Sequence, residues 1–242
     1  MLVTERKLPL SGGAEKRSYV RAMFTQIAPR YDLLNHVLSL NLDRRWRRQA
    51  VAELDWERVP AGRYLDLCSG TMDLAATLGA RPGFTGQVVG ADFVLPMLGL
   101  GRNKSDRVRP VNADALDLPF PDATFDGATV GFGVRNLADL DRGLAEAARV
   151  IQPGGRLVIL ECTTPSWQPM RAAYFLYFRR ILPLIGRLVS RHPDAYTYLP
   201  ESVLTFPEPD QLAARMSVSG FSDVRWQLLL GGICAIHVGT RR

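Results

Sequence analysis

The stretch "LDLCSGTMDL", from Leu65 to Leu74, decides the fold, because it has the pattern of a buried strand that ends in a turn and continues as a helix. The strand delivers Asp66, and the turn after it carries Gly70. In an open parallel sheet, ligands bind outside the carboxyl ends of the strands, and a glycine there lets the backbone approach a ligand closely. The stretch therefore predicts a loop that binds a nucleoside cofactor, although Met72 stands where such a turn usually carries another glycine.

Short apolar segments alternate with helical patterns from Arg63 onward. We expect strands at residues 63–68, 86–92, 108–114, 124–133 and 155–162, and helices at 73–79, 96–104 and 140–151. The last helix is predicted to stop at "PGG" (153–155), and the strand after it is a continuous apolar run typical of a sheet buried on both faces. Two final strands, 223–230 and 233–240, predict a closing antiparallel hairpin. The fold class is α/β, a doubly wound and mostly parallel sheet.

The rest of the chain is expected to add helices to this sheet within a single domain of residues 1–242, a length that suits one domain with additions. Helical spacing in "EKRSYVRAMFTQIA" and again around residues 42–54 predicts an N-terminal helical cap at 16–60. The cofactor-binding core would then span 63–161. A helical insertion facing the substrate or a membrane would span 162–206, followed by a helix near 210–218.

Composition and charge limit the classes of function and partner that the chain can have. Hydrophobic residues make up 47% and charged residues 22%, as in ordinary globular proteins, and the net charge of +6 predicts an anionic or membrane-surface partner, or none that is specific. Nucleic acid is set aside, because the basic clusters carry no recognisable binding motif. The three cysteines and three histidines lack metal-ligand spacing, so no metal is expected and a reducing cytoplasm fits best.

The acids at the strand ends indicate which nucleoside binds. A dinucleotide needs G-x-G-x-x-G to admit a pyrophosphate, and of that set this loop has Gly70 alone. S-adenosylmethionine has no phosphate, so its loop tolerates more bulk, and Asp92 at the second strand end can accept hydrogen bonds from both ribose hydroxyls. Asp114 and Ala115 are placed to border an adenine. The plainer interpretations are a helix cap or a loop hydrogen bond for Asp66, a solvated strand-end acid for Asp92, and a simple turn residue for Gly70.

Five stretches in order resemble the ubiquinone/menaquinone biosynthesis C-methyltransferases. "YDLLNHVLSLNLDRRW" (31–46) and "RVIQPGGRLVILECTTP" (149–165) are similar to the two family signatures, and residues 118–136, 194–202 and 231–239 also match. The resemblance runs from about Tyr19 to Gly239. This sequence departs from the family pattern at several positions, which are Leu34, Asp43, Ser69, Met72, Gly131 and Cys162-Thr163.

The resemblance implies a class I S-adenosylmethionine-dependent methyltransferase with a Rossmann-like fold. The residues matched to cofactor contacts are Thr71, Asp92, Asp114 and Ala115, with Asp66 and Gly70 shaping the loop. The implied reaction is methylation of a ring carbon of a polyprenylated quinol, demethylmenaquinol to menaquinol. A ubiquinone-pathway quinol or another small apolar acceptor is the alternative, and a non-catalytic scaffold is a further one.

Catalytic candidates follow from the quinol chemistry, in which loss of a hydroxyl proton makes the ring carbon nucleophilic. Arg135 is predicted to stabilise the phenolate and Asn136 to orient the ring. Three residues of the cap would close over the site, namely Tyr31, Asp32 and Asn35. Asp43 or His192 would relay the proton. The plainer alternatives are an ion pair of Arg135 with Asp139 or Asp141, packing and capping roles for Tyr31 and Asp32, and a surface position for His192.

The segment "RAAYFLYFRRILPLIGRLVSRH" (171–192) mixes aromatic residues with arginines. It could lie at a membrane interface, with arginines meeting anionic headgroups, so that the protein contacts the inner face of the membrane peripherally. It could instead line a channel for the isoprenoid tail, form a homodimer contact, or pack in the core.

Overall fold

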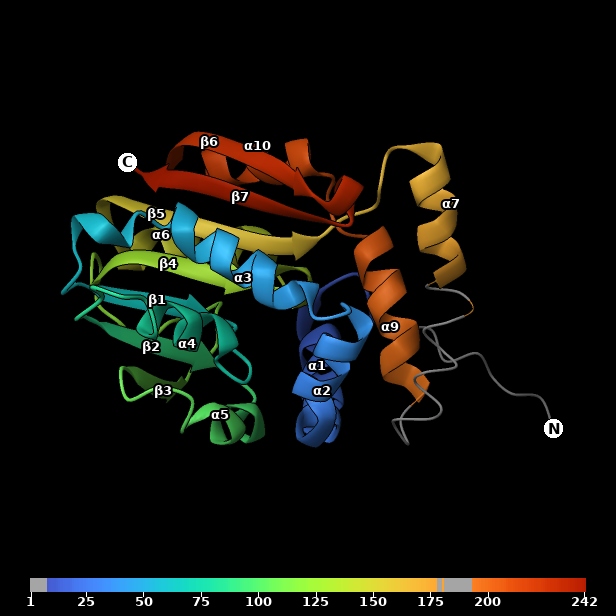
Figure 1. Cartoon of the computed structure of the whole chain (residues 1–242), viewed down its shortest axis with the longest axis horizontal. Coiled ribbons are helices and arrows are strands. Elements are labelled where there is room, and N and C mark those ends of the chain that lie inside the picture. Colours follow the sequence, from blue (N-terminus) through green and yellow to red (C-terminus); the bar gives the residue numbers. More distant parts are fainter. Residues whose placement is uncertain (1–7, 178–179, 181–192) are drawn as a thin grey trace.

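The computed structural model describes residues 8–177, 180 and 193–242, and its centre is a seven-stranded sheet (Figure 1). The order of the strands is β3-β2-β1-β4-β5-β7-β6. Their bounds are β1 Arg63–Leu67, β2 Gln87–Asp92, β3 Val108–Asn112, β4 Phe125–Gly131, β5 Ile151–Cys162, β6 Phe221–Leu229 and β7 Cys234–Arg241. Strands β1 to β5 pair in parallel, and β7 is antiparallel to both of its neighbours. The predicted α/β fold with a C-terminal antiparallel pair is confirmed.

Helices cover both faces of the sheet. The core on one face includes residues of α3 (Leu42–Glu53) and α4 (Asp73–Gly79), and the core on the other includes residues of α6 (Leu140–Val150) and α10 (Pro209–Val218). Successive side chains of β1 point to opposite faces of the sheet, so Tyr64 packs in the first core and Leu65 in the second. Helix α5 (Leu95–Gly101) follows β2, slightly earlier than the predicted 96–104.

A group of helices lies beyond the carboxyl ends of the parallel strands (Figure 1). It consists of α1 (Gly13–Ile27), α2 (Tyr31–Leu38), α7 (Gln168–Leu176) and α9 (Pro193–Leu204). The cap is fastened to the core at its start, where the backbone N of Gly13 donates to the Ala138 carbonyl at 3.1 Å and Lys16 Nζ donates to the Arg135 carbonyl at 2.9 Å. The short helix α2 was not predicted as a separate element. Of the 171–192 segment, residues 178–179 and 181–192 lie outside the described residues.

The "PGG" turn lies inside a strand. Helix α6 ends at Val150, β5 begins at Ile151, and the pairing of β4 with β5 shifts register between Phe125 and Gly127. A Cβ on Gly155 would lie 2.6 Å from the carbonyl oxygen of Asp126, so the glycine permits a close approach of the two backbones at this bulge. The helix therefore ends where expected, but the strand begins before the glycines.

Candidate functional site

The loop after β1 is held by the acid at the end of β2. The backbone N of Gly70 donates to Asp92 Oδ2 at 2.8 Å, and the backbone N of Val94 donates to Asp92 Oδ1 at 2.8 Å. Gly70 has a φ of +52°, and a Cβ there would meet Met97 at 3.5 Å and Tyr31 at 3.8 Å, which is ordinary contact. The glycine is thus favoured by its left-handed backbone more than by lack of space.

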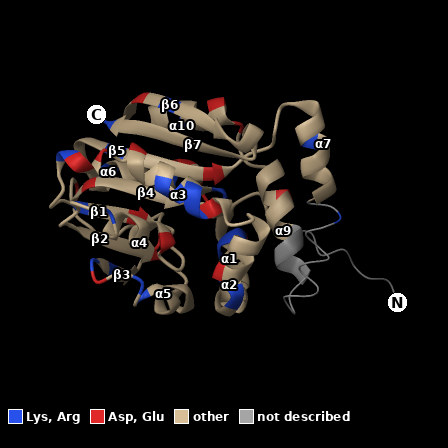
Figure 2. Ribbon diagram, in the orientation of Figure 1, with Lys and Arg blue, Asp and Glu red and all other residues tan. Residues whose placement is uncertain are grey.

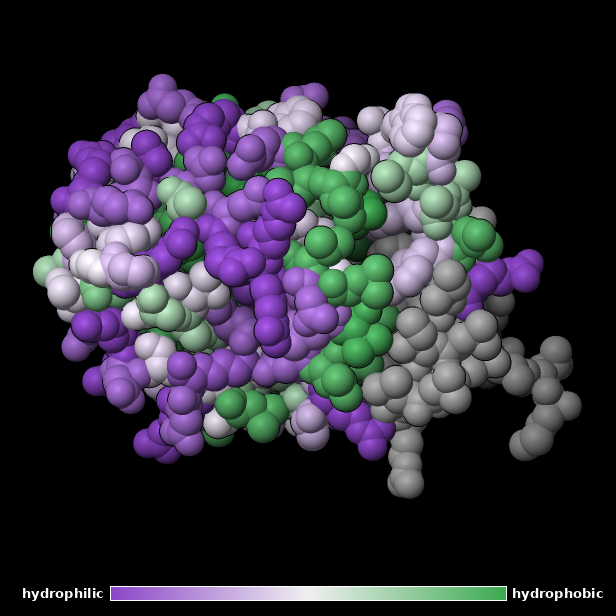
Figure 3. All heavy atoms as spheres, in the orientation of Figure 1, coloured by the Kyte–Doolittle hydropathy of each residue, from purple (hydrophilic) through white to green (hydrophobic). Residues whose placement is uncertain are grey.

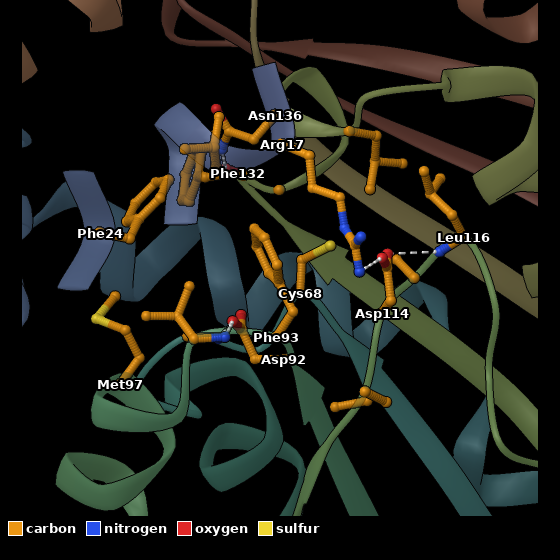
Figure 4. Close-up of a pocket in the computed structure, with 18 of the residues that line it drawn as sticks. Arg17, Phe24, Cys68, Asp92, Phe93, Met97, Asp114, Leu116, Phe132 and Asn136 are labelled. Atoms are coloured by element: carbon orange, nitrogen blue, oxygen red, sulfur yellow. Dashed lines mark hydrogen bonds and ion pairs between the residues drawn. The ribbon is translucent and has the colours of Figure 1, made fainter. Parts of the chain in front are cut away.

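A pocket opens where the parallel strands end, and we call it the strand-end pocket. Its empty volume of about 690 Å³ includes open solvent at the mouth. Figure 4 shows the carboxylates of Asp92 and Asp114 in this pocket, with Phe24, Phe93 and Met97 among its walls. Other lining residues include Arg17, Tyr31, Cys68, Gly70, Ala115, Leu116, Gly131, Phe132 and Asn136.

The two carboxylates of this pocket differ in environment. Burial raises the pKa of Asp92, and the backbone N–H groups of Val94 and Gly70 oppose that rise by stabilising the charged form. Asp114 is more exposed. Its Oδ1 accepts from the backbone N of Leu116 at 3.0 Å, and its Oδ2 lies 2.5 Å from Arg17 Nη2 of α1 (Figure 4). The cap thus contacts the pocket through Arg17, a residue that the sequence did not single out.

Two residues matched to the cofactor site lie outside the pocket lining. Asp66 is buried below the first turn of α4, where it accepts hydrogen bonds from the backbone N of Ala75 at 2.9 Å and from Thr129 Oγ1 at 3.1 Å. Burial raises the pKa of Asp66 to about 7. The Thr71 hydroxyl donates to Asp32 Oδ1 at 2.5 Å, and Lys104 Nζ lies 2.6 Å from Asp32 Oδ2. Both residues therefore fix the loop from behind.

Met72 points into the core. Its side chain is fully buried, and a Cβ on Gly90 would lie 2.8 Å from its Sδ. Its backbone has a left-handed φ of 62°, a conformation that glycine adopts at no steric cost. The position thus favours glycine for backbone reasons, and the methionine side chain fills space between β2 and α5 without entering the strand-end pocket.

A second, larger pocket lies between the cap helices and the sheet, and we call it the cap pocket. Its lining is mainly apolar and aromatic, and includes Met23, Leu34, Leu38, Trp46, Met170, Tyr174, Tyr198 and Ile233. Its empty volume of about 1560 Å³ includes open solvent at the mouth. Phe24, Tyr31, Phe132 and Asn136 line both pockets, so the two cavities meet at these four residues.

Arg135 lines the cap pocket as half of a buried ion pair. Its Nη1 lies 2.5 Å from Oε1 of Glu161, whose side chain is fully buried, and donates to the Phe132 carbonyl at 2.7 Å. Burial lowers the pKa of Arg135, but the Glu161 carboxylate outweighs it and holds that pKa above its ordinary value. The acids proposed as alternative partners are engaged elsewhere: Asp139 caps α6, and Asp141 pairs with Arg215.

Four buried polar atoms of the cap pocket lack a protein partner among the described residues. They are Nε of Arg135, Oδ1 of Asn136, Nδ2 of Asn35 and the hydroxyl oxygen of Tyr198. Buried polar groups are normally hydrogen-bonded, so such a set within one cavity indicates sites for the polar atoms of a ligand. The Arg135 and Asn35 nitrogens are donors, the Asn136 oxygen is an acceptor, and the Tyr198 hydroxyl can act as either.

Asp43 also lines the cap pocket, within a network of its own. Arg47 and Ser39 donate to its carboxylate, the latter at 2.6 Å, and His36 Nδ1 lies 2.9 Å from Asp43 Oδ2. Burial alone would raise the pKa of Asp43. The Ser39 hydroxyl and the Arg47 guanidinium stabilise the carboxylate more strongly, so the pKa lies below its ordinary value. His192, the other candidate for a proton relay, lies outside the described residues.

Tyr31 occupies the junction of the two pockets and packs edge-on against Phe24, with ring centroids 5.8 Å apart. Burial raises the pKa of its hydroxyl, which keeps the phenol neutral, and the neighbouring Asn35 side chain opposes that rise. The sequence signalled Tyr31 and Asn35, and it did not signal the aromatic walls Phe24, Phe93 and Phe132. Phe93 follows directly after Asp92, which is the one positional cue for it.

Solved structures share this fold at low sequence identity. A possible histamine N-methyltransferase from Thermotoga maritima, described as S-adenosylmethionine-dependent, superposes with a TM-score of 0.65 at 19% identity, covering 92% of this chain and 100% of that one. The [4+2]-cyclase SpnF gives the same TM-score at 18% identity, covering 92% and 95%. Since a cyclase and a methyltransferase match equally well, these structures show the fold alone.

Relatives of higher identity align over most or all of the chain. A demethylmenaquinone methyltransferase of Thermus thermophilus is 52% identical, covering 90% of this chain and 100% of the relative, and that of Deinococcus radiodurans is 48% identical over the full length of both. A ubiquinone/menaquinone biosynthesis C-methyltransferase UbiE of a Geobacter species is 45% identical, covering 94% and 98%. The model of the ubiE/COQ5 methyltransferase family matches residues 13–241, and the chain belongs to this family, as the resemblance implied.

Proposed function

We propose that this protein transfers a methyl group from S-adenosylmethionine to a ring carbon of demethylmenaquinol, giving menaquinol. The observation that carries the proposal is the junction of the two pockets at Phe24, Tyr31, Phe132 and Asn136. An apolar ring held in the cap pocket would face a cofactor held in the strand-end pocket. Methyl transfer requires this alignment of donor and acceptor above all.

The strand-end pocket fits the cofactor. After accepting from Gly70 and Val94, each oxygen of Asp92 keeps acceptor capacity for a ribose hydroxyl. Phe93 and Met97 provide apolar walls for an adenine, and Asp114 with Ala115 lies at its edge. When bound, S-adenosylmethionine supplies a methyl group on a positively charged sulfur, which is the electrophile of the reaction. Asp66 and Thr71 support the loop from outside the pocket.

The cap pocket fits an apolar acceptor with two oxygens. Arg135 Nε and Asn35 Nδ2 would donate to quinol oxygens, and Asn136 Oδ1 would accept from a hydroxyl. Glu161 neutralises the charge of Arg135, so a phenolate would gain a directed hydrogen bond from this pair instead of an uncompensated positive charge. These residues orient the ring so that its nucleophilic carbon faces the junction.

Asp43 would accept the hydroxyl proton through Ser39. Both residues line the cap pocket, and the Ser39 hydroxyl already donates to Asp43 Oδ1. Ser39 can pass its own proton to Asp43 while it takes one from the quinol. His36, in contact with Asp43 Oδ2, extends the path outward. The lowered pKa of Asp43 makes it a weak base, so the proton would move on along this contact to His36.

An exposed apolar surface next to the cap pocket supports peripheral membrane contact. It consists of Leu33, Val37 and Leu40 of α2 and the turn after it, which are 56%, 41% and 81% exposed, and Leu40 lines the pocket. Figure 3 shows hydrophobic residues gathered in the middle of this face, beside a strongly hydrophilic area, and Figure 2 shows basic residues on α1 and α3. No helix in the described part of the chain is long and apolar enough to cross a membrane. A tail entering from the bilayer would reach the pocket here.

The test is methyl transfer from labelled S-adenosylmethionine to a chemically reduced, short-tailed 2-prenyl-1,4-naphthoquinone, with the product identified by mass. A ubiquinone-type benzoquinol is assayed in parallel, since relatives carry both quinones in their names. We expect a product methylated on the ring with the naphthoquinol. If the protein binds S-adenosylmethionine but methylates neither quinol, the proposal fails. The protein is then a non-catalytic scaffold or a methyltransferase for another small apolar acceptor. The homodimer stays a prediction.

A further inference from the structure

Two of the three cysteines face each other at the wall of the cap pocket. Cys162, the last residue of β5, is directly opposite Cys234, the first of β7, in the antiparallel register, and their sulfurs are 4.0 Å apart. Directly opposed residues in antiparallel strands have Cα atoms about 4.5–5.5 Å apart, which lies in the range that disulfides span. Side-chain rotation alone can therefore bring the two sulfurs into bonding distance.

The two thiols differ in access. Cys162 is partly exposed, whereas Cys234 is fully buried, and burial raises the pKa of Cys234. The third cysteine, Cys68, lines the strand-end pocket instead. Cys162 is thus suited to attack a molecule in the cap pocket, and Cys234 to resolve the product.

We propose that Cys162 and Cys234 form a dithiol that reduces a quinone bound in the cap pocket to the quinol. The Cys162 thiolate adds to a ring carbon of the quinone and forms a C–S bond. The Cys234 sulfur then attacks the Cys162 sulfur, the C–S bond breaks, and its electron pair stays on the ring. Two thiols become one disulfide, the quinone becomes a quinol, and the two thiol protons end on its oxygens.

This step complements the methyl transfer, and it rests on the proposed function for the class of acceptor. A quinone ring is electron-poor and cannot attack an electrophilic methyl group, whereas a quinol can. The donors Arg135 Nε and Asn35 Nδ2 in the same pocket would activate the quinone carbonyls. Each chain carries one such dithiol, so a further round needs thiol–disulfide exchange with a low-molecular-weight thiol.

The first test measures the thiols directly. The reduced full-length protein is mixed without oxygen with one equivalent of 2-prenyl-1,4-naphthoquinone, and cysteines are mapped by alkylation and peptide mass. We expect loss of the quinone absorbance, one disulfide between Cys162 and Cys234, and an intact Cys68. Unchanged thiols, a stable quinone adduct without disulfide, or a disulfide that includes Cys68 would each overturn the proposal.

The second test separates reduction from methyl transfer. With excess protein and no added reductant, methyl transfer from labelled S-adenosylmethionine is measured with the quinone and with the pre-reduced quinol, and their ratio is taken for each protein. Cys162→Ala and Cys234→Ala should lose the quinone-supported product relative to their own quinol-supported product, and the matched Cys68→Ala should keep the wild-type ratio. Equal ratios in all proteins would refute the dithiol. If no protein methylates the quinol, the proposed function fails and the thiol mapping still decides this inference.

Discussion

Asp92 fixes Gly70 across two neighbouring strands, since its Oδ2 accepts a hydrogen bond from the Gly70 backbone N at 2.8 Å. The strand-end acid therefore shapes the loop as well as presenting oxygens to the pocket. The same carboxylate holds Val94 at the start of the next turn. Loop shape and ligand recognition depend here on one side chain.

Asp92→Ala should weaken S-adenosylmethionine binding. Hydrogen bonds to a charged group contribute about 1.5–3 kcal/mol, so the dissociation constant should rise by roughly ten-fold or more. Isothermal titration calorimetry measures this, with Asp106→Ala, an exposed acid before β3, as the matched control. Equal affinity of Asp92→Ala and the wild type would show that the cofactor does not contact this carboxylate.

Replacement of Met72 should separate backbone strain from packing. Met72→Ala opens a cavity and keeps a left-handed residue with a Cβ, so it should destabilise the fold by about 2–5 kcal/mol. Met72→Gly removes more atoms, but it relieves a left-handed conformation that costs about 1–2 kcal/mol. We therefore expect Met72→Gly to be no less stable than Met72→Ala in urea unfolding. A markedly less stable glycine variant would contradict the observed φ of 62°.

Asp66 should make stability depend on pH. Its pKa is raised to about 7 in the folded state, so between its ordinary value of 3.8 and about 7 the folded chain binds more protons than the unfolded chain. Its contribution to the free energy of unfolding therefore falls as pH rises through this window and levels off above it. Asp66→Asn, a neutral isostere that can still bond Ala75 and Thr129, should flatten this slope in urea titrations across the window. An unchanged slope would show that Asp66 is ionised throughout.

Asp43→Asn should affect both stability and rate. The buried Arg47 loses its nearer carboxylate and keeps Asp73 at 3.4 Å, so the loss should stay below the about 3–5 kcal/mol of a fully broken buried pair. Loss of a proton acceptor should lower kcat by about 10²-fold or more, with a changed pH profile. Glu53→Gln is the matched control on the same helix, because its pair with Arg225 lies at the surface and is worth about 0–1 kcal/mol. A stability loss without any change in the pH profile would leave Asp43 a structural residue.

The exposed apolar surface on α2 should mediate vesicle binding. Leu33→Glu with Leu40→Glu adds two charges to it and removes side chains worth about 1.5–3 kcal/mol each when buried. Affinity for vesicles containing anionic lipid should fall by about ten-fold or more in a sedimentation assay. Val218→Glu, on α10 and 89% exposed, tests whether an added charge elsewhere has the same effect. Equal losses for both variants would remove α2 from the contact.

The sequence by itself determined the fold and one edge of the site. Alternating apolar strands and helices require a doubly wound sheet, and the carboxyl ends of parallel strands share one edge, so Gly70, Asp92 and Asp114 had to lie near one another. The tertiary structure places all three at one pocket. Short-range patterns also located nearly every helix. The exceptions were α2, which is eight residues long and has no side-chain cap at its start, and the pair α7 and α9, which were expected as one helical insertion.

Only the tertiary structure decided what those side chains contact. Asp66 and Thr71 sit in the same loop as Gly70, yet they point behind it, because direction depends on the packing of α4 and of the cap. Arg135 pairs with Glu161 because it follows β4, which lies beside β5. Cys162 faces Cys234 because β5 pairs with β7, although the two cysteines are far apart in the sequence. Such contacts depend on strand order and on the volume left between distant elements, which no local pattern of residues contains.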